Sequence, residues 1–258
     1  MGINAGANAI TGVYLGDQLL TKGGGDEDYI KQFAKLVPGA DTPTKGDWDW
    51  GYFGTVAEAE LGAFDAGSQA GKIVTATTLA NQVGLTKGQI ANGVITWHKF
   101  AYRGEIMLIP QKEIRRGISW IDLAKANCVC GTNIQSIGGN KYRITLLSGY
   151  KNEYCDENYM SNDQMSAKDN EFNNLVYSLK DGTFAHLTLD ELTDTKIQGG
   201  SSNWCKNLND EEFDKSKICK NRVCRGLMTS YSFPYVYMTA TNDSNLSNAW
   251  RPALRFVP

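Results

Sequence analysis

The chain offers few side chains that could carry out acid–base chemistry near neutral pH. Its two histidines are His98 and His186, and histidine is the side chain that most readily changes charge in that range. His98 follows Trp97 in a segment that alternates like a β-strand, which favours a structural role over a catalytic one. His186 has no serine or cysteine motif beside it. Gly-x-Ser-x-Gly, phosphate-loop and His-Glu-x-x-His motifs do not occur, so the sequence predicts that the protein is not an enzyme.

Six cysteines are the next reactive groups, and all of them lie in the C-terminal half of the chain. They are Cys128, Cys130, Cys155, Cys205, Cys219 and Cys224. Their spacing does not match a common zinc pattern. Residues 1–6 lack a charged start followed by an apolar run, so we expect folding in a cytoplasm, where disulfides are rare. Buried free thiols are therefore favoured, with disulfides and a metal site as the alternatives.

The charged residues give no further sign of catalysis or of nucleic-acid binding. The acidic runs Asp26-Glu27-Asp28 and Glu211-Glu212 are interpreted as solvated faces. The 258-residue chain has a formal net charge of −2 and no clustered positive face, which nucleic acid would need. Hydrophobic residues make up 41% of the chain, enough for a buried core, and no apolar run approaches the ~20 residues that cross a bilayer. We expect no membrane insertion.

Residues 1–25 are expected to form an attachment segment. The pattern from Thr11 to Leu20 predicts two short strands around the Gly16-Asp17 turn. Gly23-Gly24-Gly25 then predicts a flexible joint. A short segment beyond such a joint can bury little of itself, which indicates an attachment or subunit-contact segment. An ordinary edge hairpin of the main domain is the alternative.

Residues 26–94 are expected to form a spacer or oligomerisation region. Asp26 is placed to cap a helix whose apolar positions are Ile30, Phe33, Ala34 and Val37, and Pro38-Gly39 would end it. A second helix is predicted from Thr77 to Val83, with Gly84 ending it. The sequence shows no clear core for an independent domain in this range.

Residues 95–258 carry the clearest pattern. A β-hairpin is predicted for residues 95–109, with Arg103-Gly104 at its turn. Ser119 has the position of an N-cap for a short helix that ends near Ala126. A second hairpin follows around Gly138-Gly139-Asn140, with Tyr142, Ile144 and Leu146 on one face. Asp169 is placed to cap a helix whose buried stripe would be Phe172, Leu175, Val176 and Leu179.

About fifty residues after that helix are dominated by polar side chains with isolated aromatics. Long loops inside a compact domain tend to be functional, and ordering them costs entropy that a rigid base must offset. The pattern is typical of a small sheet that displays loops on one side.

The end of the chain, Trp250-Arg251-Pro252-Ala253-Leu254, resembles the closing motif of C-type-lectin-like domains in phage tail and fibre proteins. Formylglycine-generating enzymes and phage tropism determinants close with related motifs. Earlier blocks resemble the same virion proteins, in order: Trp97-His98-Lys99-Phe100, Ile106-Met107-Leu108-Ile109-Pro110, Ile118-Ser119-Trp120, Tyr142-Arg143-Ile144-Thr145-Leu146-Leu147 and Glu171-Phe172-Asn173. Phe172 departs from the tryptophan usual in relatives. The resemblance runs from Trp97 to the end.

This resemblance implies an α+β fold with a C-type-lectin-like domain of small antiparallel sheets, two short helices and long loops over residues 95–258. The first and last strands of that domain should pair, which would place residues 97–102 beside residues 254–257. Arg251 is expected to anchor the last loop to the backbone or to an acid, and Trp250 is expected in the core. An oxidase of the formylglycine-generating type would need two reactive thiols, for which Cys219 and Cys224 are the candidates, but we favour no enzymatic activity.

The fold's logic places exposed residues in the loops before the final strand, where tyrosine, tryptophan and asparagine supply contact area and hydrogen bonds. The candidate ligand-binding surface is Asn203, Trp204, Asn207, Tyr231, Phe233, Tyr235, Asn242 and Asn245. No cofactor and no metal is expected, although calcium in the Asp- and Asn-rich loops stays open.

Two functions follow from the resemblance. The chain is expected to be a structural virion protein of the tail or fibre type that binds a host-surface receptor or glycan. The alternative is a capsid decoration or head-fibre protein that binds other virion subunits. Either would reside in the virion after assembly in the host cytoplasm, with a homotrimer as the expectation by analogy.

Overall fold

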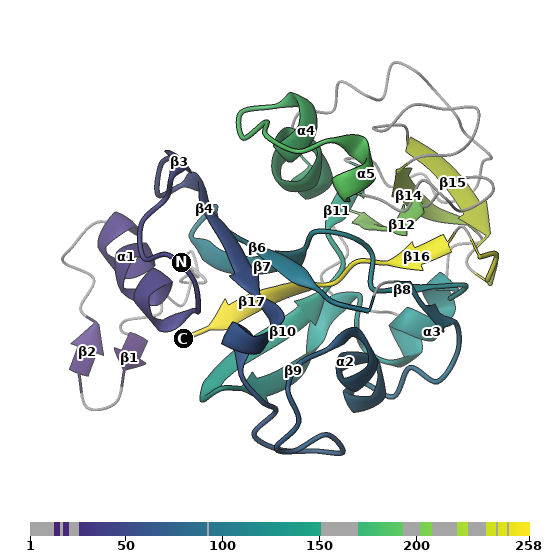
Figure 1. Cartoon of the computed structure of the whole chain (residues 1–258), viewed down its shortest axis with the longest axis horizontal. Coiled ribbons are helices and arrows are strands. Elements are labelled where there is room, and N and C mark those ends of the chain that lie inside the picture. The colour runs from purple at the N-terminus through teal and green to yellow at the C-terminus, as the bar shows by residue number, and fades with distance from the viewer. Residues whose placement is uncertain are drawn as a thin grey trace, which may run out of the picture.

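The structure is a computed structural model that describes residues 13–15, 18–20, 26–91, 93–150, 170–192, 202–207, 221–226, 236–240, 242–246 and 248–258. It is a mixed α+β fold with mostly antiparallel sheets, as the sequence predicts (Figure 1). The predicted N-terminal hairpin is present as β1 (Val13–Leu15) and β2 (Gln18–Leu20). Gly16-Asp17 at its turn and Gly23-Gly24-Gly25 lie outside the described residues, and so does Asp169.

A seven-stranded antiparallel sheet forms the base of the protein, in the order β3-β4-β6-β7-β17-β10-β9. Its strands are β3 (Lys45–Gly46), β4 (Trp50–Ala57), β6 (Thr96–Tyr102), β7 (Glu105–Pro110), β9 (Cys130–Ile137), β10 (Asn140–Thr145) and β17 (Ala253–Val257). Both predicted hairpins are confirmed, β6–β7 and β9–β10. Arg103 and Gly104 have φ angles of 49° and 81°, the positive values that a tight hairpin turn requires.

A six-stranded sheet lies beside the first, in the order β15-β14-β12-β16-β8-β5. Its strands are β5 (Gln89–Ile90), β8 (Arg115–Arg116), β12 (Ser202–Trp204), β14 (Asn221–Gly226), β15 (Val236–Ala240) and β16 (Asn248–Trp250). Strands β12 and β16 are parallel, and the other pairs are antiparallel. A separate parallel pair is formed by β11 (Ser148–Tyr150) and β13 (Lys206–Asn207).

The helices are short and mostly cover the faces of the seven-stranded sheet. They are α1 (Asp26–Leu36), the 3-10 helix η1 (Glu58–Leu61), α2 (Ala76–Gln82), α3 (Trp120–Lys125), the π-helix η3 (Phe172–Tyr177), α4 (Ser178–Asp181) and α5 (Leu189–Leu192). The predicted cap of α3 is confirmed, since the Ser119 hydroxyl accepts a hydrogen bond from the Asp122 backbone N–H at 3.2 Å. At η3, the Asn170 side-chain oxygen accepts from the Asn173 backbone N–H at 2.9 Å.

Strand alternation puts a separate core on each face of the seven-stranded sheet. On β6, Trp97 and Ala101 face the larger core, which contains the apolar sides of α1, α2 and α3. Phe100 and Tyr102 face the smaller core, which contains η3 and α4. The apolar stripes predicted for the helices are buried in these two cores: Ile30, Phe33, Ala34 and Val37 in the first, and Phe172, Leu175, Val176 and Leu179 in the second.

The prediction that residues 26–94 form a spacer is wrong. Strand β4 pairs along its length with β6, and α1 and α2 bury their apolar sides in the same core as Trp97. No core boundary therefore exists at residue 94. The sequence was misleading here because each of these elements has one apolar side only, so the partner that it packs against cannot be seen locally.

The expected pairing of residues 97–102 with the last strand is also wrong. Strand β17 lies between β7 and β10, and it contacts the first hairpin through β7. Both edges of β6 are occupied, one by β4 and the other by β7, so no edge remains for β17. The last strand still closes the sheet next to the first hairpin.

The buried Lys99 side chain fastens α1 to the sheet. Its Nζ donates hydrogen bonds to the backbone oxygens of Ala34, Val37 and Ala40 at 2.6, 2.7 and 2.7 Å. These carbonyls lie at or just beyond the C-terminal end of α1, where a helix leaves acceptors unsatisfied. Burial lowers the pKa of Lys99 to about 8, so the ammonium form still predominates at neutral pH.

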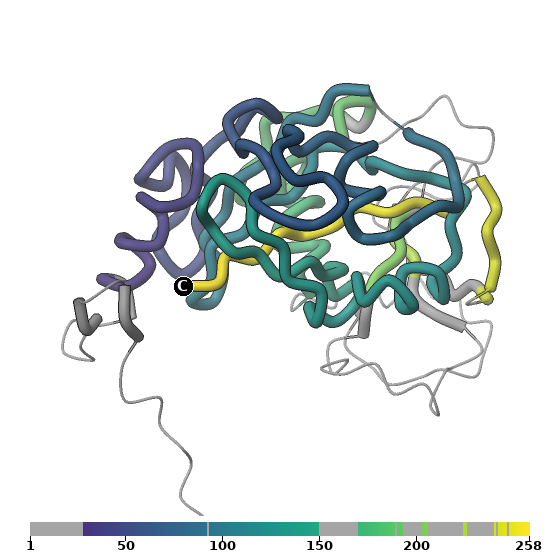
Figure 2. The backbone as a smooth tube through the Cα atoms, turned by 90° about the horizontal axis from the view of Figure 1, so that it is seen from below, coloured from purple at the N-terminus to yellow at the C-terminus, as the bar shows by residue number. Residues whose placement is uncertain are grey.

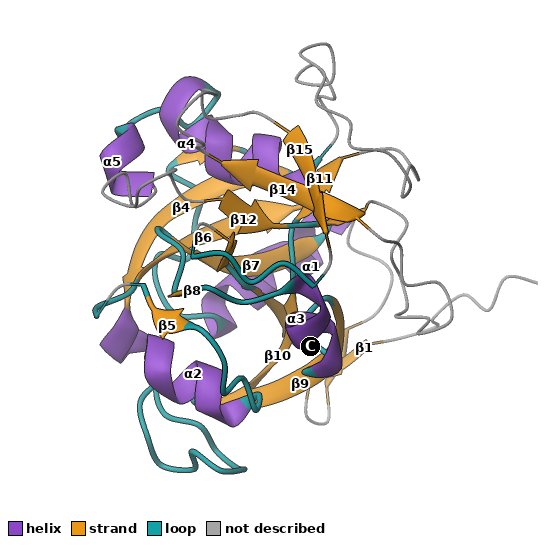
Figure 3. Cartoon of the chain, turned by 90° about the vertical axis from the view of Figure 1, so that its right-hand side faces the viewer, coloured by secondary structure: helices purple, strands orange, loops and turns teal. Residues whose placement is uncertain are grey.

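The two sheets give the molecule two distinct ends. Helix α1 and the C-terminal residue lie at one end, and strands β12, β14 and β15 lie at the other (Figure 1). A view from below shows the same separation between the purple α1 and the yellow segment 242–250 (Figure 2). Figure 3 looks onto the second end, where β12, β14 and β15 lie near α4 and α5.

Candidate functional site

The surface predicted in the loops is only partly supported by the structure. Asn242 and Asn245 are exposed, which agrees with the prediction. Asn207 is the second residue of β13, opposite Tyr150 of β11, and its side chain is outside what the structure describes. Tyr231, Phe233 and Tyr235 lie outside the described residues.

The prediction that Asn203 and Trp204 are exposed is wrong, because each is only 1% exposed. Both belong to β12, which lies between β14 and β16 inside the six-stranded sheet. The Trp204 indole packs in the larger core and donates a hydrogen bond from Nε1 to the backbone oxygen of Ile118 at 2.7 Å. These residues therefore hold the sheet in place and cannot contact a ligand.

Arg251 anchors the last loop to an acid and to the backbone, as predicted, and it is almost completely buried. Its guanidinium lies 3.4 Å from the Glu113 carboxylate and donates from Nε to the Asn203 side-chain oxygen at 3.2 Å. It also donates to the backbone oxygen of Leu192. Burial lowers the pKa of Arg251, and the Glu113 carboxylate opposes that shift. Trp250 beside it is fully buried, which confirms the expected core position.

A second buried arginine, Arg255, joins the last strand to the start of η3. It contacts Glu171 at 2.6 Å, Glu105 at 2.5 Å and the Thr145 hydroxyl at 2.8 Å. Burial by itself would lower the pKa of Arg255, but the two carboxylates outweigh it and raise the pKa. The charge is thus compensated where water is excluded, which is the condition for a buried ion pair to be tolerated.

A third buried arginine, Arg225, connects β14 with the parallel pair and η3. It donates to the Gly149 backbone oxygen at 2.8 Å and to the Asn173 side-chain oxygen, and its guanidinium lies 5.2 Å from the centre of the Phe172 ring. Burial lowers its pKa to about 10, so it stays charged at neutral pH. Arg225 and Arg251 therefore fix the six-stranded sheet to distant segments, and Arg255 fixes the last strand of the base to the start of η3. The sequence pattern does not reveal these contacts.

Residues far apart in the sequence meet in a chain of hydrogen bonds on the face of the sheet that carries the smaller core. The Tyr52 hydroxyl lies 3.1 Å from His98 Nδ1 and 3.3 Å from His186 Nε2, and His186 Nδ1 lies 2.6 Å from the backbone oxygen of Phe184. Sequence reasoning considered the two histidines separately and missed this arrangement. The aromatic Tyr52 in the Asp47–Gly54 stretch gave no signal that it would bridge them.

The Phe184 carbonyl fixes which atom donates in each of these hydrogen bonds. A carbonyl only accepts, so His186 Nδ1 carries a proton, and a neutral His186 accepts from the Tyr52 hydroxyl at Nε2. Tyr52 oxygen then receives the Nδ1 proton of His98. His98 Nε2 is left as a buried acceptor with no partner among the described residues. Burial, with smaller effects of His186 and Arg251, lowers the pKa of His98 to about 3, and burial raises the pKa of Tyr52 to about 12.

Two of the thiols that the structure describes are poor nucleophiles. Cys128 and Cys205 are fully buried. Burial raises the pKa of Cys205 to about 12 and that of Cys128 further, so both remain thiols at neutral pH. Cys155 and Cys219 lie outside the described residues. No group of three or more His, Cys, Asp or Glu side chains among the described residues is arranged to hold a metal ion.

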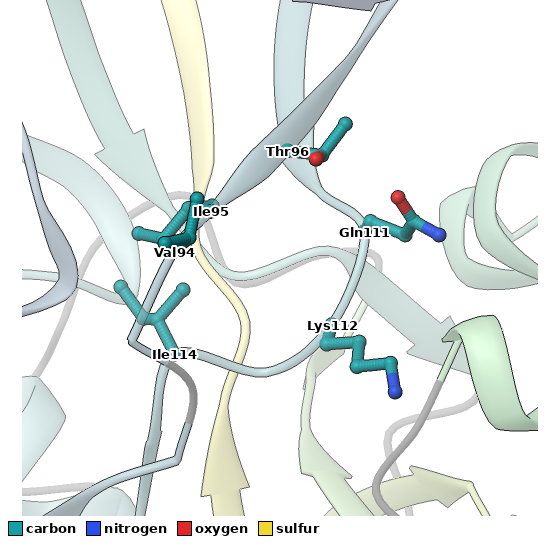
Figure 4. A pocket seen from close by; sticks show the side chains of 6 residues that line it. All are labelled: Val94, Ile95, Thr96, Gln111, Lys112 and Ile114. Carbon is teal, nitrogen blue, oxygen red and sulfur yellow. The ribbon is translucent and has the colours of Figure 1, made fainter. Parts of the chain in front are cut away.

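A small cavity of about 220 Å³ opens where the two sheets meet. It is lined by Val94, Ile95, Thr96, Gln111, Lys112 and Ile114. The apolar side chains gather on one side of the close-up view, and those of Gln111 and Lys112 lie on the other (Figure 4). Backbone hydrogen bonds fix both walls, from Gln111 N to Thr96 O at 2.8 Å and from Ile114 N to Trp250 O at 3.0 Å.

Comparison with known proteins adds no relative: no protein-family model, curated protein or solved structure matches the chain. The fold and its sites define the class only coarsely, as a mixed α+β protein with mostly antiparallel sheets. Among the described helices, none is long and apolar enough to span a membrane.

Proposed function

We propose that the chain is a structural protein of a bacteriophage particle, of the tail or fibre type, whose C-type-lectin-like end binds a receptor or glycan on the host surface. The observation that supports this proposal most is the fixing of the six-stranded sheet by the buried Arg225 and Arg251. A sheet held rigidly at the end opposite α1 suits the display of a binding surface.

The order of the chain fits this proposal. Strands β12, β14 and β15 flank residues 208–220 and 227–235 in the sequence, and the second of these segments contains Tyr231, Phe233 and Tyr235. Asn242 and Asn245 follow β15 and are exposed. The proposal places other virion subunits at residues 1–25, assigns the particle as the protein's location, takes a homotrimer as its form, and includes no catalytic activity.

Binding of the purified, fluorescently labelled protein to host cells tests the proposal. A variant with Tyr231→Ala, Tyr235→Ala, Asn242→Ala and Asn245→Ala should bind about tenfold more weakly, because such side chains supply most of the energy in loop-based interfaces. The matched control changes Lys35→Ala and Lys141→Ala, which are exposed and lie on α1 and β10. Cell binding that is absent, or that both variants reduce equally, contradicts the proposal.

The decoration or head-fibre function remains the alternative, and the exposed apolar side chains of Ile90, Val94 and Leu246 favour a contact with another subunit. Pull-down of the protein with other capsid or tail proteins, together with no binding to host cells, would support it in place of adhesion.

A further inference from the structure

The cavity between residues 94–96 and 111–114 contains polar groups that the fold does not use. The Thr96 hydroxyl, the Gln111 amide and the Lys112 ammonium make no hydrogen bond or ion pair with any described residue. All three side chains are half-buried. Half-buried polar groups with no partner inside the protein bind water when the cavity is empty, and three that line one cavity can exchange that water for a ligand.

The opposite wall of the cavity is apolar. Ile95 and Ile114 are buried to within a few per cent, whereas Val94 at the mouth is 80% exposed. A ligand that fits both walls needs an apolar face for the three aliphatic side chains and several hydroxyl groups for Thr96 and Gln111. One face of a sugar ring presents C–H groups while its edge presents hydroxyls, which matches this lining.

Lys112 is the one charged side chain among the six that line the cavity, and it forms no ion pair with a described residue. Lys112 has a carboxylate in its neighbourhood, that of Glu191, but Glu191 Oε2 accepts two hydrogen bonds from Thr188 at 2.7 Å each and thereby caps α5. Glu58 lies against the backbone of Ile95, with Oε2 3.5 Å from the Ile95 N–H, and does not reach Lys112 within ion-pair distance. The ammonium is therefore available for a carboxylate on a ligand.

We infer that this cavity binds a single acidic sugar unit, a hexuronate, of a surface polysaccharide. The inference rests on the proposed function, since it names the kind of glycan that the displayed protein would recognise. Lys112 pairs with the sugar carboxylate, Thr96 and Gln111 bond to ring hydroxyls, and the aliphatic wall covers one ring face. The volume of about 220 Å³ is smaller than the ~300–1,000 Å³ of sites for drug-sized ligands, as expected for one sugar ring.

Titration of the full-length, isotope-labelled protein with sodium glucuronate, glucose and acetate at constant ionic strength tests this site. Glucuronate should shift the Gln111 side-chain amide and Thr96 signals with a dissociation constant of about 1 mM, the weak affinity expected of so small a ligand. Glucose and acetate should each bind at least about tenfold more weakly, because each lacks one half of the recognised chemistry.

Two variants identify the residues. Lys112→Met should weaken glucuronate binding about tenfold and remove the preference over glucose. Lys125→Met, which changes an exposed lysine on α3, should leave both unchanged. An unchanged thermal unfolding midpoint shows that each variant is folded.

No shift with glucuronate, equal binding of glucose or acetate, or equal binding by the Lys112→Met variant would each overturn the inference. Cells that bind the protein while glucuronate does not would overturn this site and leave the proposed function standing. Glucuronate binding without cell binding would support this site and contradict the proposed function.

Discussion

The two sheets are built in different ways. The seven-stranded sheet contains two predicted hairpins, has antiparallel pairs throughout and is covered by an apolar core on each face. The six-stranded sheet gathers strands from residues 89–250, mixes parallel and antiparallel pairs, and is joined to the base by buried arginines. Apolar burial thus fixes the first sheet, whereas the second is fixed by polar contacts between distant segments in addition to the packing of Trp204 and Trp250 in the larger core.

The difference suggests that the seven-stranded sheet supplies most of the stability and that the six-stranded sheet carries the proposed binding surface. A base held by nondirectional apolar packing tolerates many residue combinations. A second sheet held by guanidinium contacts depends on a few directional bonds, each of which is costly to lose because its partners are buried. The four predictions below are ordered from the largest expected effect to the smallest.

Arg255→Met should have the largest effect. The change leaves Glu105 and Glu171 without the buried guanidinium, and removal of one member of a buried pair costs about 3–5 kcal/mol of unfolding free energy. Arg143→Met is the matched control, because Arg143 contacts the same Glu105 at 2.7 Å but its side chain is 43% exposed. We expect it to cost less than about 1 kcal/mol. Urea unfolding measures both, and equal losses would show that the buried contact has no special role.

Lys99→Met should have the next largest effect, since it removes the donor to three backbone oxygens at the end of α1. We expect a loss of about 2–3 kcal/mol, the cost of leaving buried acceptors unsatisfied. Lys35→Met changes an exposed lysine of the same helix and should cost less than about 0.5 kcal/mol. If the two variants unfold at the same urea concentration, Lys99 does not fasten α1 to the sheet.

His98 should make the protein less stable in acid. The pKa of His98 is about 3 in the folded protein against an ordinary value of 6.5, so between these values the unfolded chain binds a proton that the folded chain does not. The unfolding free energy should therefore fall as the pH falls from about 6.5 toward 3, by up to about 1.4 kcal/mol per pH unit from this residue. His98→Gln should lose this contribution to the slope. A variant with the same pH slope as the unchanged protein would mean that His98 is charged in the fold.

Ser119→Ala should have the smallest effect, about 1 kcal/mol, because it removes one cap bond at the start of α3. Thermal unfolding of this variant beside the Arg255→Met variant compares a local contact with one that joins distant segments. A larger loss for Ser119→Ala would reverse the ranking proposed here.

The sequence predicts the parts of the fold that depend on near neighbours and misses those that depend on distant residues. The hairpins at Gly104 and Gly139, the cap at Ser119 and the apolar stripe from Ile30 to Val37 depend on neighbours within a few residues, and all were predictable. The packing of α1 and β4 against β6 was not, because the pairing of β4 with β6 and the Lys99 contacts join residues that are 39 or more positions apart.

The candidate site shows the same limit. The isolated position of Trp204 among polar residues predicts an exposed loop residue, whereas the strand order places it inside a sheet. Arg251 was predicted correctly as an anchor, but its partners Glu113 and Asn203 could not be named. The cavity at Thr96 and Lys112 had no sequence signal. Its lining residues come from the two ends of the hairpin formed by β6 and β7, and the sequence pattern of that hairpin indicates only which residues face the core.

Electron micrographs of phage particles that encode this chain, labelled with an antibody fragment raised against the purified protein, test the central claim most directly. The account predicts label at the tail or fibre ends and reduced adsorption of the labelled particles to host cells. Particles that carry no label, although the fragment binds the purified protein, would contradict it.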